Sequence, residues 1–260
     1  MKRRSFVLSG LAASAMSPGG LGMPPGGPRA WFELRFFHLR NDFDRSRLDT
    51  LLKDIYLPAS GRLGFGPVGF FNVSVGPDMP TLVGLTSYPS LAALEAAQDG
   101  LAADSAWNKA IEEFSKPKEP AYSRMESRLI RAFASMPSIE IPPQETGRAA
   151  RVFELRVYEA RNLKASLMKI KMFEEGEIAI FRKTGLLPVF FGQTVVGPGL
   201  PSLTYMLAYD SVEAREENWR KFINHPEWVK LRAQSGYSDA EIVSNINSCF
   251  LRPTNYSPIR

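Results

Sequence analysis

The chain has 260 residues, of which 44% are hydrophobic, and it contains enough apolar material for two packed cores. No apolar run approaches the ~18 to 20 residues of a membrane span, so we expect no integral membrane protein. Of 32 basic residues, Lys2, Arg3 and Arg4 belong to an N-terminal segment with its own pattern. The other 29 nearly balance the 27 acidic residues in number. This balance excludes a nucleic-acid-binding footprint. The single cysteine, Cys249, excludes an internal disulfide and lies in an apolar, strand-like run.

The N-terminal segment has the pattern of a twin-arginine export signal. Arg3 and Arg4 precede a short apolar stretch, residues 6–12, and the small residues 13–15 follow it. We expect cleavage after Ala15 and a flexible Gly- and Pro-rich leader over residues 16–30. The alternative is a basic, disordered N-terminus with an accidental arginine pair. The signal predicts export to the periplasm or the extracellular space.

The rest of the chain repeats itself without a gap. At a shift of 121 positions, residues 32–35 (Phe-Glu-Leu-Arg) recur as residues 153–156, and 25 of the 106 pairs from residue 32 to residue 137 are identical. Unrelated chains of ordinary composition would match at roughly one position in sixteen. The period is too long for a solenoid unit. We therefore predict a first domain over 31–136, a linker over 137–150 and a second domain over 151–257, with any functional site where the copies meet.

Periodicity predicts the elements of the first copy. Alternating apolar and charged residues predict a strand over 32–37, and Asn41 is placed to cap a helix over 44–60. A second strand over 68–75 leads through a Gly-Pro hairpin into a third over 82–88. A helical segment over 90–115 and a last strand near 126–133 follow. The first helix should bury its apolar stripe, Leu48, Leu51, Leu52 and Ile55.

The second copy repeats this order. We expect strands over 152–158, 189–196, 203–209 and 247–252, and helical segments over 163–183 and 211–235. Asn162 should cap the first of these helices, and its buried stripe should contain Leu163, Leu167, Ile170 and Phe181. The order is βαββαβ twice, which is the ferredoxin-like α+β arrangement. Each sheet has helices on one face only, so we expect the two bare faces to pack together as an intramolecular α/β barrel.

Several of these features together resemble the NIPSNAP family of dimeric α/β-barrel proteins. They are the repeated Phe-Glu-Leu-Arg strand, the Gly-x-x-Pro turn, the Gly-Pro hairpin, and residues 219–222 (Trp-Arg-Lys-Phe) followed by 225–228 (His-Pro-Glu-Trp). The resemblance implies a barrel of two domains and supplies no catalytic motif. The first copy departs from it, because Asp104 stands where the second copy has His225.

Candidate site residues come from the repeated first strands. Glu33 and Arg35 share one face with Phe37, as Glu154 and Arg156 share one with Tyr158. We expect this face to point into the barrel and residues 32, 34 and 36 to pack under the helices. Buried charges must pair, so each acid should form an ion pair with an arginine. These pairs are either structural bridges or the walls of a pocket for a polar or anionic organic ligand, with an arginine clamping a carboxylate. The last strands could add Arg131 and Arg252, and the third strands Tyr88 and Tyr209.

Two functional classes stay open. The first is an exported protein that binds a small molecule or a partner without chemistry. The second is a cofactor-independent or haem-dependent oxidoreductase or monooxygenase, an analogy with related barrels that rests on fold alone. His38 and His225 lack spaced carboxylate or cysteine partners, so we predict no metal site. His225 precedes a proline at a helix start, which favours a capping role over a haem ligand. The pattern decides neither whether the protein is an enzyme nor whether the two-copy unit forms a homo-oligomer.

Overall fold

The computed structural model describes residues 27–40, 45–144 and 149–260. The export signal and the helix cap predicted at Asn41 lie outside these ranges. The matching cap in the second copy is confirmed, because the side chain of Asn162 accepts a hydrogen bond from the backbone N–H of Ala165. In the described part of the chain, no helix has both the length and the apolar character needed to cross a membrane.

The element order is βαββαβ in each copy, as predicted. The first copy contains β1 (Trp31–His38), α1 (Ser46–Thr50), η1 (Leu51–Tyr56), α2 (Leu57–Leu63), β2 (Val68–Val75), β3 (Thr81–Tyr88), α3 (Leu91–Ala103), α4 (Ser105–Ser115) and β4 (Arg124–Ala132). The second contains β5 (Val152–Ala160), α5 (Leu163–Met172), η2 (Phe173–Glu177), α6 (Ile178–Lys183), β6 (Leu187–Val196), β7 (Ser202–Tyr209), α7 (Val212–Ile223), α8 (Pro226–Arg232), α9 (Asp239–Ile242) and β8 (Val243–Pro253). In both copies a π-helical segment, η1 or η2, interrupts the first helix at the same place.

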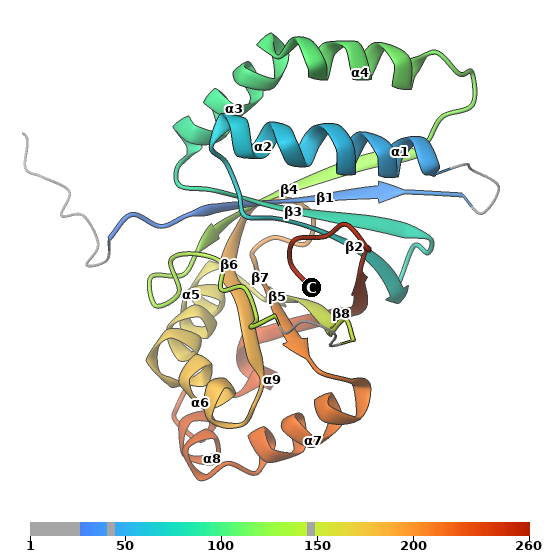
Figure 1. Ribbon diagram of the computed structural model, residues 1–260. Coiled ribbons are helices and arrows are strands. Elements are labelled where there is room, and N and C mark those ends of the chain that lie inside the picture. Colours follow the sequence, from blue (N-terminus) through green and yellow to red (C-terminus); the bar gives the residue numbers. More distant parts are fainter. Residues whose placement is uncertain (1–26, 41–44, 145–148) are drawn as a thin grey trace, which may run out of the picture.

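The strands form one closed barrel in the order β1-β3-β2-β8-β5-β7-β6-β4. Each copy supplies a four-stranded antiparallel sheet, and the sheets join edge to edge through β2–β8 and β4–β6. Figure 1 shows the helices of the first copy above the barrel and those of the second below it. Closure pairs the edge strands of both sheets, which removes the exposed edges of an isolated sheet. The predicted intramolecular α/β barrel is therefore confirmed.

The barrel interior is apolar, which makes the predicted orientation of the first strands wrong. The interior cluster contains Phe32, Leu34 and Phe36 from β1 together with Phe153 and Leu155 from β5. Phe37 and Tyr158 belong instead to the two clusters between sheet and helices. Residues 33, 35, 154 and 156 share the helix-facing side with them, so these charges do not point into the barrel. Strand periodicity assigns residues to a common face but does not say which face turns inward.

The predicted buried stripe of the second helix is also partly wrong. Leu163 and Leu167 are 71% and 61% exposed, whereas Phe181 is fully buried. In the first helix, by contrast, Leu48, Leu51 and Leu52 are buried as expected. Helix α5 turns a different face toward the sheet, and that face contains a buried lysine, Lys169. The exposed leucines follow from this rotation, because the polar group and its partners occupy the space that an apolar stripe would fill.

The two ends of the barrel differ. Corresponding strands run in the same direction, so the ends of β1 and β5 and the hairpins over 76–80 and 197–201 meet at one end, which we call the mouth. The opposite end is covered by the start of the linker, around Ile139, and by the C-terminal segment. Ile139 packs against the interior cluster, and Ile259 is a fully buried member of it. The backbone N–H of Phe70 donates to Ser257 Oγ at 2.9 Å, which fixes the C-terminal segment across the start of β2.

Because Ile259 fills the closed end, we predict that Ile259→Ala lowers the free energy of unfolding by about 2 to 4 kcal/mol, the usual range for a cavity left in a packed core. Urea denaturation measures this loss. Ile223→Ala is the matched control, since that side chain is 49% exposed on α7 and its truncation should change stability by less than about 0.5 kcal/mol. Equal effects of the two substitutions would show that the C-terminal segment does not seal the barrel.

Candidate functional site

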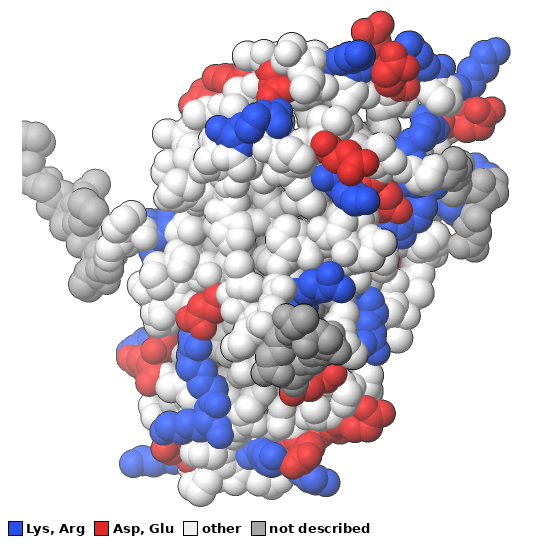
Figure 2. All heavy atoms as spheres, viewed as in Figure 1, with Lys and Arg blue, Asp and Glu red and all other residues white. Residues whose placement is uncertain are grey.

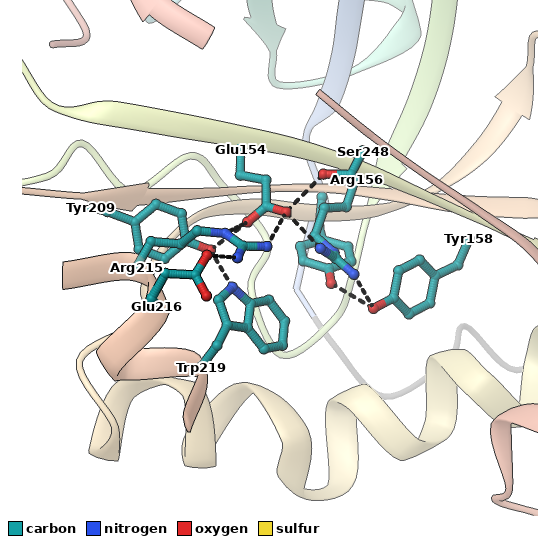
Figure 3. A network of polar contacts seen from close by, with 9 residues as sticks. Glu154, Arg156, Tyr158, Tyr209, Arg215, Glu216, Trp219 and Ser248 are labelled. Carbon is teal, nitrogen blue, oxygen red and sulfur yellow. Dashed lines mark hydrogen bonds and ion pairs between the residues drawn. The ribbon is translucent and has the colours of Figure 1, made fainter. Parts of the chain in front are cut away.

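The carboxylate of Glu154 is the centre of a polar network between the second sheet and its helices (Figure 3). It is fully buried, and Arg156 Nη1 lies 2.6 Å from its Oε1. Arg215, from α7, donates to both oxygens at 3.0 Å. Ser248 Oγ donates at 2.7 Å and Tyr209 OH at 2.9 Å. The ion pair predicted for this strand is present, and it is held by two arginines rather than one.

The surroundings of Glu154 keep it ionised. Burial by itself would raise the pKa of this carboxyl, but the hydrogen bond from Arg215 and the charge of Arg156 outweigh it and lower the pKa to about 2. Burial raises the pKa of Tyr209, which therefore acts as a neutral donor. The guanidinium of Arg156 stacks on Trp219, with its Cζ 4.9 Å from the ring centroid. The network therefore resembles a structural bridge, in which the carboxylate is already saturated with donors.

The first copy contains a smaller version of the same network. Arg35 Nε lies 2.8 Å from Glu33 Oε1, and the carboxylate also accepts from Ser127 at 2.8 Å and Tyr88 at 3.2 Å. The second arginine is missing, because Leu94 stands at the position of Arg215. The shared acid, arginine, serine and tyrosine thus belong to the common fold. Sequence comparison of the copies pointed to the acid and the arginine but missed the serine, although Ser127 and Ser248 are also identical at the shift.

The second copy also buries an ion pair that the sequence analysis missed. Lys169 Nζ lies 3.3 Å from Glu177 Oε2, and both side chains are almost fully buried. The ammonium lies within 5.7 Å of the ring centroids of Tyr158, Phe173 and Trp228. The first copy has Leu48 and Tyr56 at the lysine and glutamate positions. The simultaneous replacement of two apolar positions by a lysine and a glutamate could have indicated this ion pair. A lysine next to other charges, however, is usually part of a solvated helix face.

The remaining predicted residues are not brought together. Arg131 stacks over Trp31, with 6.0 Å between its Cζ and the ring centroid, and Arg252 is exposed. Both lie near the ends of β4 and β8, away from the mouth. His225 is the N-cap of α8 and its Nδ1 accepts from the backbone N–H of Glu227 at 3.3 Å, which confirms its capping role. Among the described residues, no cluster of three His, Cys, Asp or Glu side chains could hold a metal ion.

A cavity of about 90 Å³ lies at the mouth, where residues of both copies meet. Its walls are largely apolar, with Phe36 and Val73 from the first copy facing Leu155, Val157 and Cys249 from the second. Its polar lining residues are His38, Asp78, Thr81, Arg128, Asn247 and Ser248. None of the residues predicted for the ligand pocket, Glu33, Arg35, Glu154, Arg156, Tyr158, Arg131 and Arg252, lines this cavity. A cavity is thus present where the two copies meet, as expected for a site, but the residues that line it are not the predicted ones.

Two buried nitrogen atoms in the cavity wall lack a hydrogen-bond partner among the described residues. They are Arg128 Nε and His38 Nε2. His38 Nε2 lies 3.2 Å from Glu126 Oε1, but the contact is not aligned as a hydrogen bond. The Arg128 guanidinium stacks over Phe36 at 4.1 Å and reaches Glu126 Oε2 only at 3.5 Å. A buried donor left without a partner, as at Arg128 Nε, costs about 1 to 3 kcal/mol, so an acceptor atom in the cavity would stabilise it.

The other chemistry-bearing residue of the cavity is Cys249. Burial raises the pKa of its thiol to about 11, although the charge of Arg128 acts in the opposite direction. A thiol with this pKa is protonated at neutral pH and is a poor nucleophile. Cys249 therefore acts as a small apolar wall residue, while Arg128 supplies the positive charge of the site.

The low pKa of Glu154 makes a prediction about acid stability. Because the folded-state pKa lies below the ordinary value of 4.5, the ionised carboxylate stabilises the fold above pH 4.5, and this stabilisation is lost as the pH falls toward 2. The loss should be on the order of 3 kcal/mol. Glu154→Gln should lower stability at pH 7, because two buried arginines lose their anionic partner, and should flatten the acid dependence. Urea denaturation at a series of pH values measures both effects.

Glu216→Gln is the matched control for this experiment. Glu216 also binds Arg215, at 2.6 Å, but its side chain is 67% exposed. Its substitution should leave the acid dependence of stability as in the wild type, because exposed ion pairs contribute little. If both variants showed the wild-type acid dependence, Glu154 would not be the group that titrates.

The family model described as NIPSNAP matches residues 32–137 and 153–258. A search of curated proteins found no match. Among solved structures, a putative monooxygenase from Fusobacterium nucleatum is similar with a TM-score of 0.57 at 10% identity, over 86% of this chain and 92% of that one. A putative monooxygenase from Lactobacillus acidophilus gives 0.55 at 11% identity, over 86% and 94%. A NIPSNAP family protein from Agrobacterium tumefaciens is 24% identical, with a TM-score of 0.38 over 42% of this chain and 99% of that one.

The two-domain matches share the barrel with this chain, and their identity is too low to show more than the fold. The family model matches both copies over nearly their full length. The chain therefore belongs to the NIPSNAP family and contains two tandem NIPSNAP domains that close one α/β barrel.

Proposed function

We propose that the protein binds a small organic anion in the mouth cavity between its two domains. The observation that supports this function is the buried Arg128 Nε, a donor that lacks a hydrogen-bond partner among the described residues, in the wall of a cavity lined by both copies. A carboxylate oxygen at this position would accept hydrogen bonds from a guanidinium, and such charge-assisted bonds are about twice as strong as neutral ones. The apolar walls strengthen the attraction by excluding water.

We place the carboxylate clamp at Arg128 and not at the arginines that the sequence predicted. Arg35 and Arg156 already bind Glu33 and Glu154 and lie on the helix side of the sheets. Arg128 has no such close partner, because its nearest carboxylate, that of Glu126, lies 3.5 Å away and is shared with Arg124 at 3.1 Å. The burial and the charge that define a carboxylate clamp thus occur together at the mouth.

The test is a ligand-observed NMR titration with butanoate, and with 1-butanol as its neutral analogue. We predict that butanoate binds more tightly than butanol and that Arg128→Gln weakens butanoate about 10- to 100-fold, the equivalent of one lost charged hydrogen bond. Arg182→Gln is the matched control, since it removes the same charge from an exposed pair with Glu140. Equal affinities for butanoate and butanol, or equal effects of the two variants, would contradict an anion site at Arg128.

A second candidate is oxidoreductase chemistry in the same cavity. Its support is the likeness in fold to the two proteins described as putative monooxygenases. At such low identity this likeness concerns fold alone, so oxidoreductase chemistry has less support than ligand binding. A haem-dependent version gains no support from His225, because a second cavity beside α8 is lined by Trp228, Val229, Arg232, Ala233, Tyr237 and Ser238 and does not include that histidine.

We further propose that the protein is exported through its N-terminal twin-arginine signal. The support is the order of arginine pair, apolar stretch and small residues in the first 15 positions. Replacing Arg3 and Arg4 by lysine should leave the full-length precursor in the cytoplasm, as measured by cell fractionation and mass of the mature chain. Arg29→Lys, beyond the expected cleavage site, should not change export. Export of the double-lysine variant at the wild-type level would contradict the signal.

A further inference from the structure

The hairpins at the mouth expose apolar side chains at the same positions in both copies. Val75 and Met79 are 60% and 52% exposed, and their counterparts at the shift, Val196 and Leu200, are 56% and 49% exposed. The two valines end β2 and β6, and Met79 and Leu200 lie in the hairpins that follow these strands at the mouth. Single exposed apolar residues are normal, but repeated ones beside a cavity are typical of a binding surface.

Both hairpins lie directly against the cavity wall. A Cβ atom at Gly76 would be 2.6 Å from Cys249 Cβ, and one at Gly197 would be 3.4 Å from Arg128 Cγ. Pro77 and Asp78, from the tip of the first hairpin, themselves line the cavity. The glycines of both hairpins are therefore neighbours of the two residues that define the site, the arginine and the cysteine, and the four exposed apolar side chains lie next to these glycines or within three residues of them, outside the cavity lining.

The two acidic groups at the mouth are shared between two arginines. Arg124 lies 3.1 Å from Glu126 and 3.7 Å from Asp78, so one surface arginine partly neutralises both acids. Arg128 is deeper, with a side chain that is 22% exposed, and its Nε is unpartnered. On the face shown in Figure 2, charged side chains gather over the helices, and much of the barrel surface between them is uncharged. An anionic group at the mouth would thus meet the Arg128 guanidinium beside the pair of Arg124 and Glu126.

The size of the cavity limits what can enter it. About 90 Å³ holds several water molecules or a compact head group, but not a drug-sized ligand. The rest of a larger ligand would have to extend outward between the hairpins over 76–80 and 197–201. There it would cover Val75, Met79, Val196 and Leu200, which are apolar. The ligand that fits both regions has a charged end and an apolar end.

We propose that the ligand of the mouth site is an amphipathic organic anion, a carboxylate with an apolar chain, whose head group binds at Arg128 and whose chain lies between the two hairpins. This inference rests on the proposed anion site and adds the chemical class of the ligand. It also assigns a role to the repeated apolar tips, which the fold does not require because none of them belongs to the three hydrophobic clusters.

A chain-length series tests the apolar half of the site. The affinities of ethanoate, butanoate, hexanoate and octanoate are measured by NMR titration or calorimetry below their micelle-forming concentrations. Each methylene that becomes buried should tighten binding about threefold to fourfold, which corresponds to ~0.8 kcal/mol. We expect this gain to continue beyond butanoate, because the longer chains reach the hairpins. The matching alcohols should bind more weakly at every length.

The double variant Met79→Ser/Leu200→Ser identifies the surface that the chain covers. It should bind ethanoate as the wild type does and lose most of the gain from butanoate to octanoate. The matched control is Leu91→Ser/Val212→Ser, at equivalent positions that are 45% and 41% exposed at the starts of α3 and α7, opposite the mouth, and it should keep the full gain.

The outcomes separate this inference from the proposed function. If Arg128→Gln weakens ethanoate but affinity does not rise with chain length, the anion site stands and the amphipathic ligand is wrong. If no carboxylate binds, the anion site itself is wrong. If the hairpin variant keeps the chain-length gain and instead changes the oligomeric state in ultracentrifugation, the apolar tips are a protein contact and the inference is overturned.

Discussion

Closure of the barrel through the two seams, β2–β8 and β4–β6, is the constraint on which the rest of the structure depends. Once both sheets share one interior, that interior excludes water and receives side chains from eight strands. A charge placed there would lose its hydration with few donors to replace it. Beneath the helices, by contrast, hydroxyl, indole and guanidinium groups can reach a carboxylate. The phenylalanine and leucine side chains of β1 and β5 therefore point into the barrel, and the glutamate and arginine side chains point toward the helices.

The second copy uses the helix side of its sheet differently from the first. Arg215, Lys169 and Glu177 replace Leu94, Leu48 and Tyr56, so the same fold holds a saturated polar network in one half and mostly aromatic and aliphatic packing in the other. Buried ion pairs often contribute little net stability and can instead favour one arrangement over its alternatives. In a chain with two similar domains, distinct cores reduce the number of ways in which one half could substitute for the other during folding.

Most of the fold could be predicted from the sequence because strand and helix periodicities are local, and the duplication gave each element twice. Which face of β1 turns inward could not, since both faces are buried and the strand pattern is the same in either orientation. The exposure of Leu163 and Leu167 could not be predicted either, because it depends on the face of α5 that contains Lys169 and its buried ion pair with Glu177. The candidate site was missed almost entirely. Arg128 and Cys249 lie on strands that pair across the seams. Pairing between the two copies creates the cavity, and no local sequence pattern predicts which residues line it.

The site shows what duplication within one chain makes possible. Arg128 and Cys249 occupy equivalent positions of the two copies, and both line the mouth cavity. A barrel made from two identical subunits would place the same residue at both positions, either two guanidinium groups in one small cavity or none. Two like charges at such close quarters repel each other strongly where water is excluded. With both copies in one chain, one position has a cation and the other a small, protonated thiol, an asymmetry that suits the proposed site for a single anion.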